Sequence, residues 1–121
     1  AAYGLLAAGY LALGLAYGAG FSEVAALHVL GIGAVGGMTL TVMTRATLGH
    51  TGRRLTAPAP VAAAFPMLVA ATVLRAAGSY GGLDLYYAAM LGSGALWIGA
   101  FLLFLVAVAG PLTAPRADRA A

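Results

Sequence analysis

The sequence predicts an all-α integral membrane protein built from four antiparallel transmembrane helices. Hydrophobic residues make up 63% of the 121 positions and charged residues only 7%, whereas a soluble domain carries about 25% charged residues. The hydrophobic residues form four long runs, and the polar, glycine and proline residues are concentrated between them. Because these runs are continuous rather than alternating, they favour helices over the strands of a membrane β-barrel. A soluble fold is excluded.

The first two runs predict helices over residues 2–20 and 24–48. A bilayer core of about 30 Å needs roughly 20 apolar residues in a helix, and both runs are long enough. The first carries no charge. The second follows Ser22 and Glu23, which have the form of an N-cap and an acidic first-turn residue, and we expect it to end at Gly49.

The third and fourth runs predict helices over residues 59–77 and 84–109. The third starts near the prolines Pro58 and Pro60 and ends before a glycine-rich stretch at 78–82. We expect the fourth to end at Gly110-Pro111, because proline interrupts a helix. Residues 110–121 then form a short tail. Since the loops are short, consecutive helices should be antiparallel neighbours within a single transmembrane domain, residues 1–121.

The arginines predict the orientation of this domain. With four spans, the N-terminus, the second loop and the C-terminus lie on one side, and that side holds most of the arginines: Arg45, Arg53, Arg54, Arg116 and Arg119. The other side holds Arg75 with Glu23 and Asp84. By the positive-inside rule both termini, including the tail, are cytoplasmic. The net charge of +3 is too small and scattered to indicate nucleic-acid binding.

Small residues are the predicted contacts between helices. Lipid tails are as apolar as leucine, so helices associate through close backbone approach rather than through burial from water. The pairs Gly14/Gly18 and Gly33/Gly37 have the required spacing of four, and Gly92 lies in a third patch that also contains Ser93 and Gly94. Packing within the domain or against a second copy would use these faces.

The histidines are the main candidates for binding a metal or cofactor. His28 lies about one turn inside the outer end of the second helix, where it is either a ligand or an interfacial residue bonded to a carbonyl or water. His50 lies just beyond the inner end of the same helix. The two are 22 positions apart, about 33 Å along a helix, so they cannot share one metal ion. Met90 lies at a depth similar to that of His28. It is the one soft ligand in the chain that is placed to bind the same metal as His28.

Arginines could bind an anion near the membrane surface. Arg45 and Arg53 are candidates for clamping a carboxylate, such as a haem propionate, or they snorkel to lipid phosphate. Arg75 pairs either with Asp84 across the third loop or with an anionic group. One stripe of the fourth helix either packs against neighbouring helices or forms one wall of a pocket for a flat cofactor. Its side chains are Tyr86, Met90, Ser93, Trp97 and Phe104. Cysteine is absent, and no nucleophile–base pair or carboxylate pair is visible, so whether the chain is an enzyme stays open.

The second helix and the loop after it resemble the NnrS family. The stretch HVLGIGAVGGMTLTVMTRATLGHTGRRL, residues 28–55, carries the resemblance, and its most specific part runs from Met43-Thr44-Arg45 to Leu48-Gly49-His50-Thr51-Gly52-Arg53. The fourth helix is similar to the family's closing pattern in Ala95-Leu96-Trp97, Ala100-Phe101, Pro111 and Arg116. Members of this family are multi-pass proteins of the bacterial inner membrane, described as containing haem and copper and linked to the response to nitric oxide.

This resemblance implies a function and a set of site residues. The family's members are much longer than this chain, which resembles their C-terminal portion and would belong to a larger polytopic bundle. His28 becomes a candidate haem or copper ligand and His50 a second metal ligand, with Arg45 and Arg53 as cofactor-binding supports. The remaining ligands would come from other helices of the protein or from other subunits.

Two other functions remain open at this point. The chain could be a segment of a transporter for small solutes or anions in which Arg45 and Arg75 bind the anion. It could also be a structural bundle without a cofactor that holds a partner through its glycine faces.

Overall fold

The computed structural model describes residues 2–117, which form helices and loops and contain no strand. Helix α1 spans Ala2–Ala19. Helices α2 (Glu23–His28), η1 (Val29–Val35) and α3 (Gly36–His50) follow one another without a break, and α4 (Ala59–Gly78) and α5 (Leu83–Thr113) complete the fold. Four helices, counting Glu23–His50 as one, are long and apolar enough to cross a membrane. This confirms the predicted fold class and implies a lipid bilayer around the chain.

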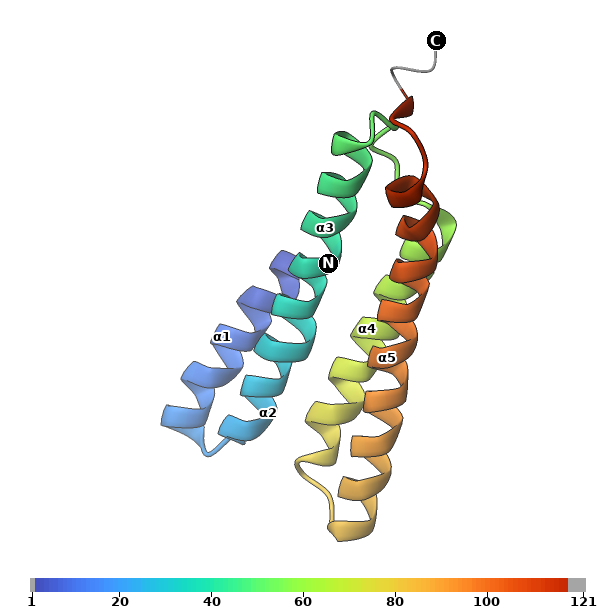
Figure 1. Cartoon of the computed structure of the whole chain (residues 1–121). Coiled ribbons are helices and arrows are strands. Elements are labelled where there is room, and N and C mark those ends of the chain that lie inside the picture. Colours follow the sequence, from blue (N-terminus) through green and yellow to red (C-terminus); the bar gives the residue numbers. More distant parts are fainter. Residues whose placement is uncertain (1, 118–121) are drawn as a thin grey trace.

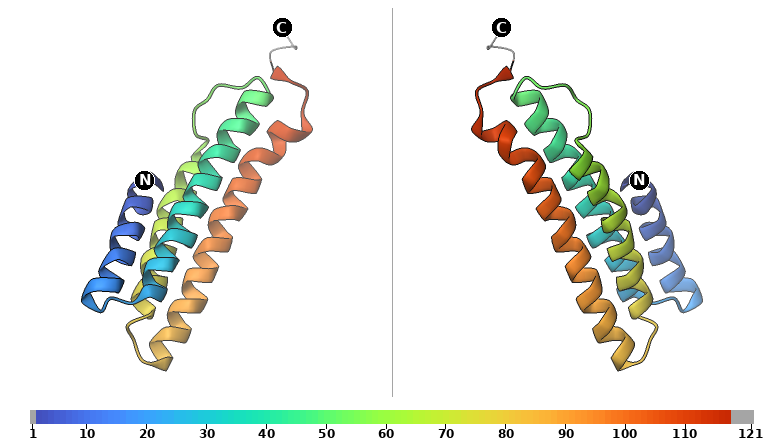
Figure 2. Two further views of the ribbon diagram at one scale, coloured as in Figure 1. Left: turned by 90° about the vertical axis from the view of Figure 1, so that its left-hand side faces the viewer. Right: turned by 90° about the vertical axis from the view of Figure 1, so that its right-hand side faces the viewer.

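The helices lie as antiparallel neighbours in an elongated bundle (Figure 1). Helix α1 packs beside the α2–η1–α3 helix, and α4 and α5 form the second hairpin (Figure 2). Loops 20–22 and 79–82 lie at one end, here called the Tyr80 end, where the Ser22 N–H donates to the Tyr80 hydroxyl at 3.3 Å. The loop at 51–58 and residues 114–117 lie at the other end, here called the Arg53 end.

The start of α2 follows the predicted capping pattern. Ser22 is the N-cap, and its Oγ accepts a hydrogen bond from the Ala25 N–H at 3.2 Å. Glu23 occupies the first turn, where a negative charge favours the helix dipole. The chain reverses direction just before this point at Gly20, whose φ of 71° is in the left-handed region that glycine adopts without strain. A three-residue loop is therefore sufficient to reverse the chain between α1 and α2.

Helix α3 ends later than the sequence predicted. The expected stop at Gly49 is wrong: the helix includes His50, and its C-cap is Thr51. Gly52, with φ 69°, is the residue that turns the chain. The Arg53 N–H donates to the Leu48 carbonyl at 2.9 Å and the Gly52 N–H to the Gly49 carbonyl at 3.2 Å, which is the Schellman pattern. Gly52 rather than Gly49 supplies the left-handed residue that this ending requires.

Helix α5 also continues beyond its predicted end at Gly110-Pro111. It includes Pro111 and ends at Thr113. The last turn is stabilised by the Thr113 hydroxyl, which donates to the Ala109 carbonyl at 2.8 Å, and by the Ala114 N–H, which donates to the Gly110 carbonyl at 3.0 Å. Proline removes one N–H from the helix, and this turn is bent away from the helix axis (Figure 2).

The middle of the second span is a π-helix, which the sequence did not predict. It covers Val29–Val35 and begins directly after His28. It is packed between α1 and α4: a Cβ on Gly33 would lie 3.0 Å from Thr72 Cγ2 and 3.1 Å from Leu5 Cδ1. π segments are rare and occur often at functional sites. Because this segment lies between His28 and α3, it sets the direction of the His28 side chain relative to the side chains of α3.

The hydrophobic core lies between α3, α4 and α5, toward the Arg53 end. Its buried members are Leu40, Val61, Ala64, Leu68, Ala100, Phe104 and Val108. Of the predicted glycine contacts, Gly33 and Gly37 are buried against neighbouring helices, and a Cβ on Gly37 would lie 3.1 Å from the Ala2 Cβ. A Cβ on Gly14 or on Gly18 would meet nothing within 4 Å. The first glycine pair of the sequence is therefore not a site of close helix packing among the described residues.

Candidate functional site

A groove near the Tyr80 end brings together one histidine, one arginine and one methionine of the membrane-spanning helices. Its volume is about 420 Å³, within the range of small-ligand sites. It is bounded by the second span, α4 and α5, and its lining residues are His28, Ile32, Arg75, Met90, Ser93, Gly94, Trp97 and Ile98. Most of this lining is apolar, and the basic groups come from His28 and Arg75.

His28 is half-buried at the junction of α2 and the π segment. It lies five residues into the span, about 7.5 Å from the helix start. Its Nδ1 is buried and has no hydrogen-bond partner among the described residues. The Val24 carbonyl, one turn earlier, is close enough to interact with the ring, but no contact of Nδ1 has hydrogen-bond geometry. An acceptor carbonyl thus lies beside the ring, and the choice between a ligand and an interfacial histidine stays a prediction.

Arg75 approaches the same groove from α4. Its Nη2 donates to the Tyr86 hydroxyl at 3.1 Å, and its Cζ lies 4.8 Å from the centre of the Tyr86 ring, a cation–π contact. Its Nη1 is buried without a partner, and among residues 2–117 the guanidinium makes no ion pair with Asp84 or Glu23. The expected pairing of Arg75 with Asp84 is absent. The guanidinium is held in place by Tyr86 and keeps one unsatisfied amino group.

The wall formed by α5 carries Met90, Ser93 and Trp97. Met90 is 37% exposed, and Trp97 is in contact with Phe101, the ring centres being 4.5 Å apart. The Ser93 hydroxyl is occupied, since it donates to the Met90 carbonyl at 3.1 Å. Of the predicted stripe on this helix, Met90, Ser93 and Trp97 face the groove, whereas Phe104 belongs to the core. A thioether and an indole thus face the histidine-bearing helix.

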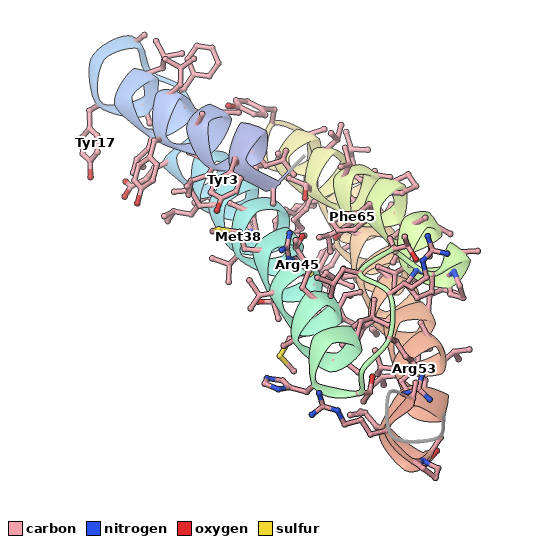
Figure 3. The ribbon with its side chains drawn as sticks, turned by 90° about the horizontal axis from the view of Figure 1, so that it is seen from above. Tyr3, Tyr17, Met38, Arg45, Arg53 and Phe65 are labelled. Carbon is pink, nitrogen blue, oxygen red and sulfur yellow. The ribbon has the colours of Figure 1, made fainter. Side chains whose placement is uncertain are left out.

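Arg45 and Arg53 lie toward the opposite end of the bundle (Figure 3), where His50 ends α3. Arg45 is exposed on α3 beside a small hollow of about 140 Å³, and His50 is exposed at the last position of α3. Arg53 lies on the following loop, where its Nη1 donates to the carbonyls of Thr51 at 3.4 Å and Pro111 at 3.3 Å. The structure therefore separates His28 from His50, Arg45 and Arg53, as the spacing of the histidines predicted.

A second hollow of about 380 Å³ lies where α1 begins beside α3 and α4 (Figure 3). Its lining includes Tyr3, Met38, Thr41 and Phe65 but no histidine or arginine. No group of three or more histidine, cysteine or acidic side chains able to hold a metal is present in residues 2–117. The groove with His28 is therefore the better candidate, because both buried unpartnered side-chain atoms of this part of the chain belong to its lining residues.

Four helices able to span a membrane define a multi-pass membrane protein, and a groove between these helices contains a histidine, a methionine and an arginine. The sequence model of the family described as NnrS protein matches residues 1–116, so the chain belongs to the NnrS family, as the resemblance predicted. Comparisons with curated proteins and with solved structures gave no match.

Sequence reasoning identified His28 and Met90, and it expected Arg75 to pair with Asp84 or with an anionic group, but it did not place Arg75 beside His28. The signal that could have grouped the three is depth. His28 lies about 7.5 Å, Arg75 about 4.5 Å and Met90 about 10.5 Å from the helix ends at the Tyr80 end, at 1.5 Å per residue. The sequence does not show which side of each helix contacts its neighbour. Only the packing of α4 and α5 on the second span brings these three side chains together.

Proposed function

We propose that this chain is the C-terminal membrane segment of a haem- and copper-containing protein that acts in the bacterial response to nitric oxide. Membership of the NnrS family supports this assignment. The observation that carries it is the buried, unpartnered Nδ1 of His28 in a groove that also contains Met90. Histidine is a common axial ligand of haem iron, and thioether sulphur is a ligand of both haem iron and copper.

The residues of the groove fit one side of such a centre. The second ring nitrogen of His28, Nε2, makes no hydrogen bond among the described residues and is not buried, so it is free to act as a ligand. Ile32, Trp97 and Ile98 supply an apolar wall of the kind that lines haem pockets. A bound haem or copper would supply the centre at which nitric oxide binds or exchanges electrons.

The chain does not supply a complete ligand set. A haem or copper ion held by His28 needs further ligands or a second wall, because residues 2–117 offer no other histidine, cysteine or acidic cluster at this site. We propose that other helices of a larger protein, or another subunit, provide them. This chain's part is to hold an imidazole at a fixed depth and to keep water from one face of the centre.

The second group of predicted residues is proposed to form a separate centre at the Arg53 end. His50 is its proposed metal ligand, and Arg45 and Arg53 are its proposed supports. Both His50 and Arg45 are exposed there, while one amino group of Arg53 fastens the loop to α5. The anion-transport alternative is weakened, because Arg45 and Arg75 lie at opposite ends of the bundle and cannot bind one anion together.

The proposed location is the bacterial inner membrane, with the Arg53 end in the cytoplasm. Four arginines belong to that end, namely Arg45, Arg53, Arg54 and Arg116. The Tyr80 end has Arg75 with Glu23 and Asp84. This distribution follows the positive-inside rule, and it supports the proposal that both termini are cytoplasmic. Arg119, also used in the prediction, lies outside the described residues.

Metal analysis of the purified full-length protein tests this function. We expect haem iron to co-purify with the wild type and to be lost in His28→Ala, with the helical content unchanged by circular dichroism. Met90→Leu should lower copper or alter the haem spectrum if its thioether is a ligand. His50→Ala, at the far end of the same helix, should leave the haem of the groove in place and lower only the metal proposed for the Arg53 end. Purified protein with neither haem nor copper would contradict the proposal.

A further inference from the structure

We propose that Arg75 is an anion-binding residue, and that the groove next to His28 takes a ligand with a carboxylate-like group of two acceptor oxygens. The inference starts from the two unpartnered atoms of the groove. His28 Nδ1 and Arg75 Nη1 are both buried without a hydrogen bond, and the two side chains are close enough to interact electrostatically. An unsatisfied buried donor is costly, so two in one groove indicate a missing partner.

These two side chains cannot satisfy one another when His28 binds a metal through Nε2, and to this extent the inference rests on the proposed function. A guanidinium carries donors only. A histidine that binds a metal through one nitrogen donates the N–H of the other, and in protein sites that N–H is almost always accepted by a carboxylate, a carbonyl or water. Two donors facing one groove therefore need an acceptor from a third group. Ser93 cannot be that group, because its hydroxyl is already bonded to the Met90 carbonyl.

Charge points to an anion rather than to a neutral acceptor. Both acidic residues among 2–117, Glu23 and Asp84, are exposed, and neither forms an ion pair with Arg75. The guanidinium is half-buried in a span, where an unpaired charge is unfavourable. Its bond to the Tyr86 hydroxyl and its stacking on that ring keep it inside the bundle rather than allowing it to extend to the surface. A fixed, unpaired guanidinium is the usual partner of a carboxylate.

Two sources could supply such a group. One is the propionate of a porphyrin bound in the groove, and in this case the inference rests on the proposed function. The other is a free small monoanion such as formate, which needs no haem. Both would be bound through the same Arg75 amino group and the same charge.

Titration of the full-length protein in lipid nanodiscs with hemin and with hemin dimethyl ester separates these sources. The ester has the same iron and ring but no free carboxylate. We expect Arg75→Gln to weaken hemin binding by about 10-fold to 100-fold, the range for one charged hydrogen bond, and to change ester binding less than about 2-fold. Arg75→Lys, which keeps the charge, should restore part of the affinity. Arg54→Gln, an exposed loop arginine at the other end, is the control and should have no effect.

Formate titration provides the second arm. Trp97, the one tryptophan of this sequence, lines the groove and reports binding through the part of the fluorescence change that Trp97→Phe removes. If wild-type protein binds no hemin, the proposed haem site is wrong. The formate titration alone then tests whether Arg75 binds an anion. A formate response that Arg75→Gln abolishes would support a free anion as the ligand.

Two results would overturn the inference. One is an equal loss of hemin and ester affinity in Arg75→Gln, since this would make Arg75 a structural residue without a role in carboxylate recognition. The other is an Arg75→Gln protein that folds normally by circular dichroism and binds hemin, ester and formate like the wild type.

Discussion

Adding one methyl group at Gly33 should destabilise the bundle, while the same change at Gly31 should not. A Cβ at position 33 would lie 3.0 Å from both Cγ2 and Oγ1 of Thr72, whereas a Cβ at position 31 meets nothing within 4 Å. Thr72 cannot easily move aside. It is 1% exposed, and its Oγ1 donates to the Leu68 carbonyl at 2.8 Å.

The magnitude follows from comparing the two variants. Replacing glycine by alanine inside a helix is worth up to about 1 kcal/mol at either position, so this term cancels in the difference. What remains is the cost of overpacking at position 33, about 1–3 kcal/mol. Gly33→Ala should therefore have a free energy of unfolding lower than that of Gly31→Ala by about 1–3 kcal/mol.

Reversible unfolding in mixed micelles, with SDS as the denaturant and circular dichroism as the signal, measures this difference. Both positions lie in the π segment that follows His28, so hemin affinity measured on the same samples shows whether displacing this segment also disturbs the groove. Equal stability of the two variants, or a more stable Gly33→Ala, would refute the packing of α4 against the π segment described here.

Two further predictions concern the core and the exit loop. Leu68→Ala should lower the free energy of unfolding by about 2–5 kcal/mol, because Leu68 is 1% exposed in the core, while Leu105→Ala, 55% exposed, should cost much less in the same titration. Arg53→Gln removes the hydrogen bond to the Pro111 carbonyl and should therefore increase the rate of proteolysis in the loop after α3. Loss of one hydrogen bond worth about 1 kcal/mol corresponds to a rate increase of several-fold. Arg54→Gln, with no such contact among the described residues, should leave the cleavage rate unchanged, and equal rates in the two variants would contradict the tether.

The four spans could be predicted because apolar runs of sufficient length have few alternatives to a transmembrane helix. The ends were less predictable. Gly49 and Gly52 are both plausible helix stops in sequence, and the hydrogen bonds of Arg53 and Gly52 at the end of α3 decide between them. At the end of α5, the Thr113 hydroxyl supports a last turn that the proline rule alone excludes.

The π segment and the groove were not predictable for a different reason. The π segment is apolar on every side, so hydrophobic periodicity contains no signal that distinguishes i→i+4 from i→i+5 bonding. His28 could be singled out because an ionisable residue inside a span is unusual. That it shares a groove with Arg75 depends on how α4 packs against the second span, which is a property of shape rather than of residue type.

The central claim is that the His28 imidazole is a metal ligand in the groove, and absorption spectroscopy with chemical rescue tests it most directly. Wild-type full-length protein should show a haem Soret band. In His28→Ala this band should be shifted or lost, and millimolar imidazole added to the variant should restore it by replacing the missing ring. A band that is the same in the wild type and in His28→Ala, with no response to imidazole, would show that the ligand lies elsewhere and would contradict the account.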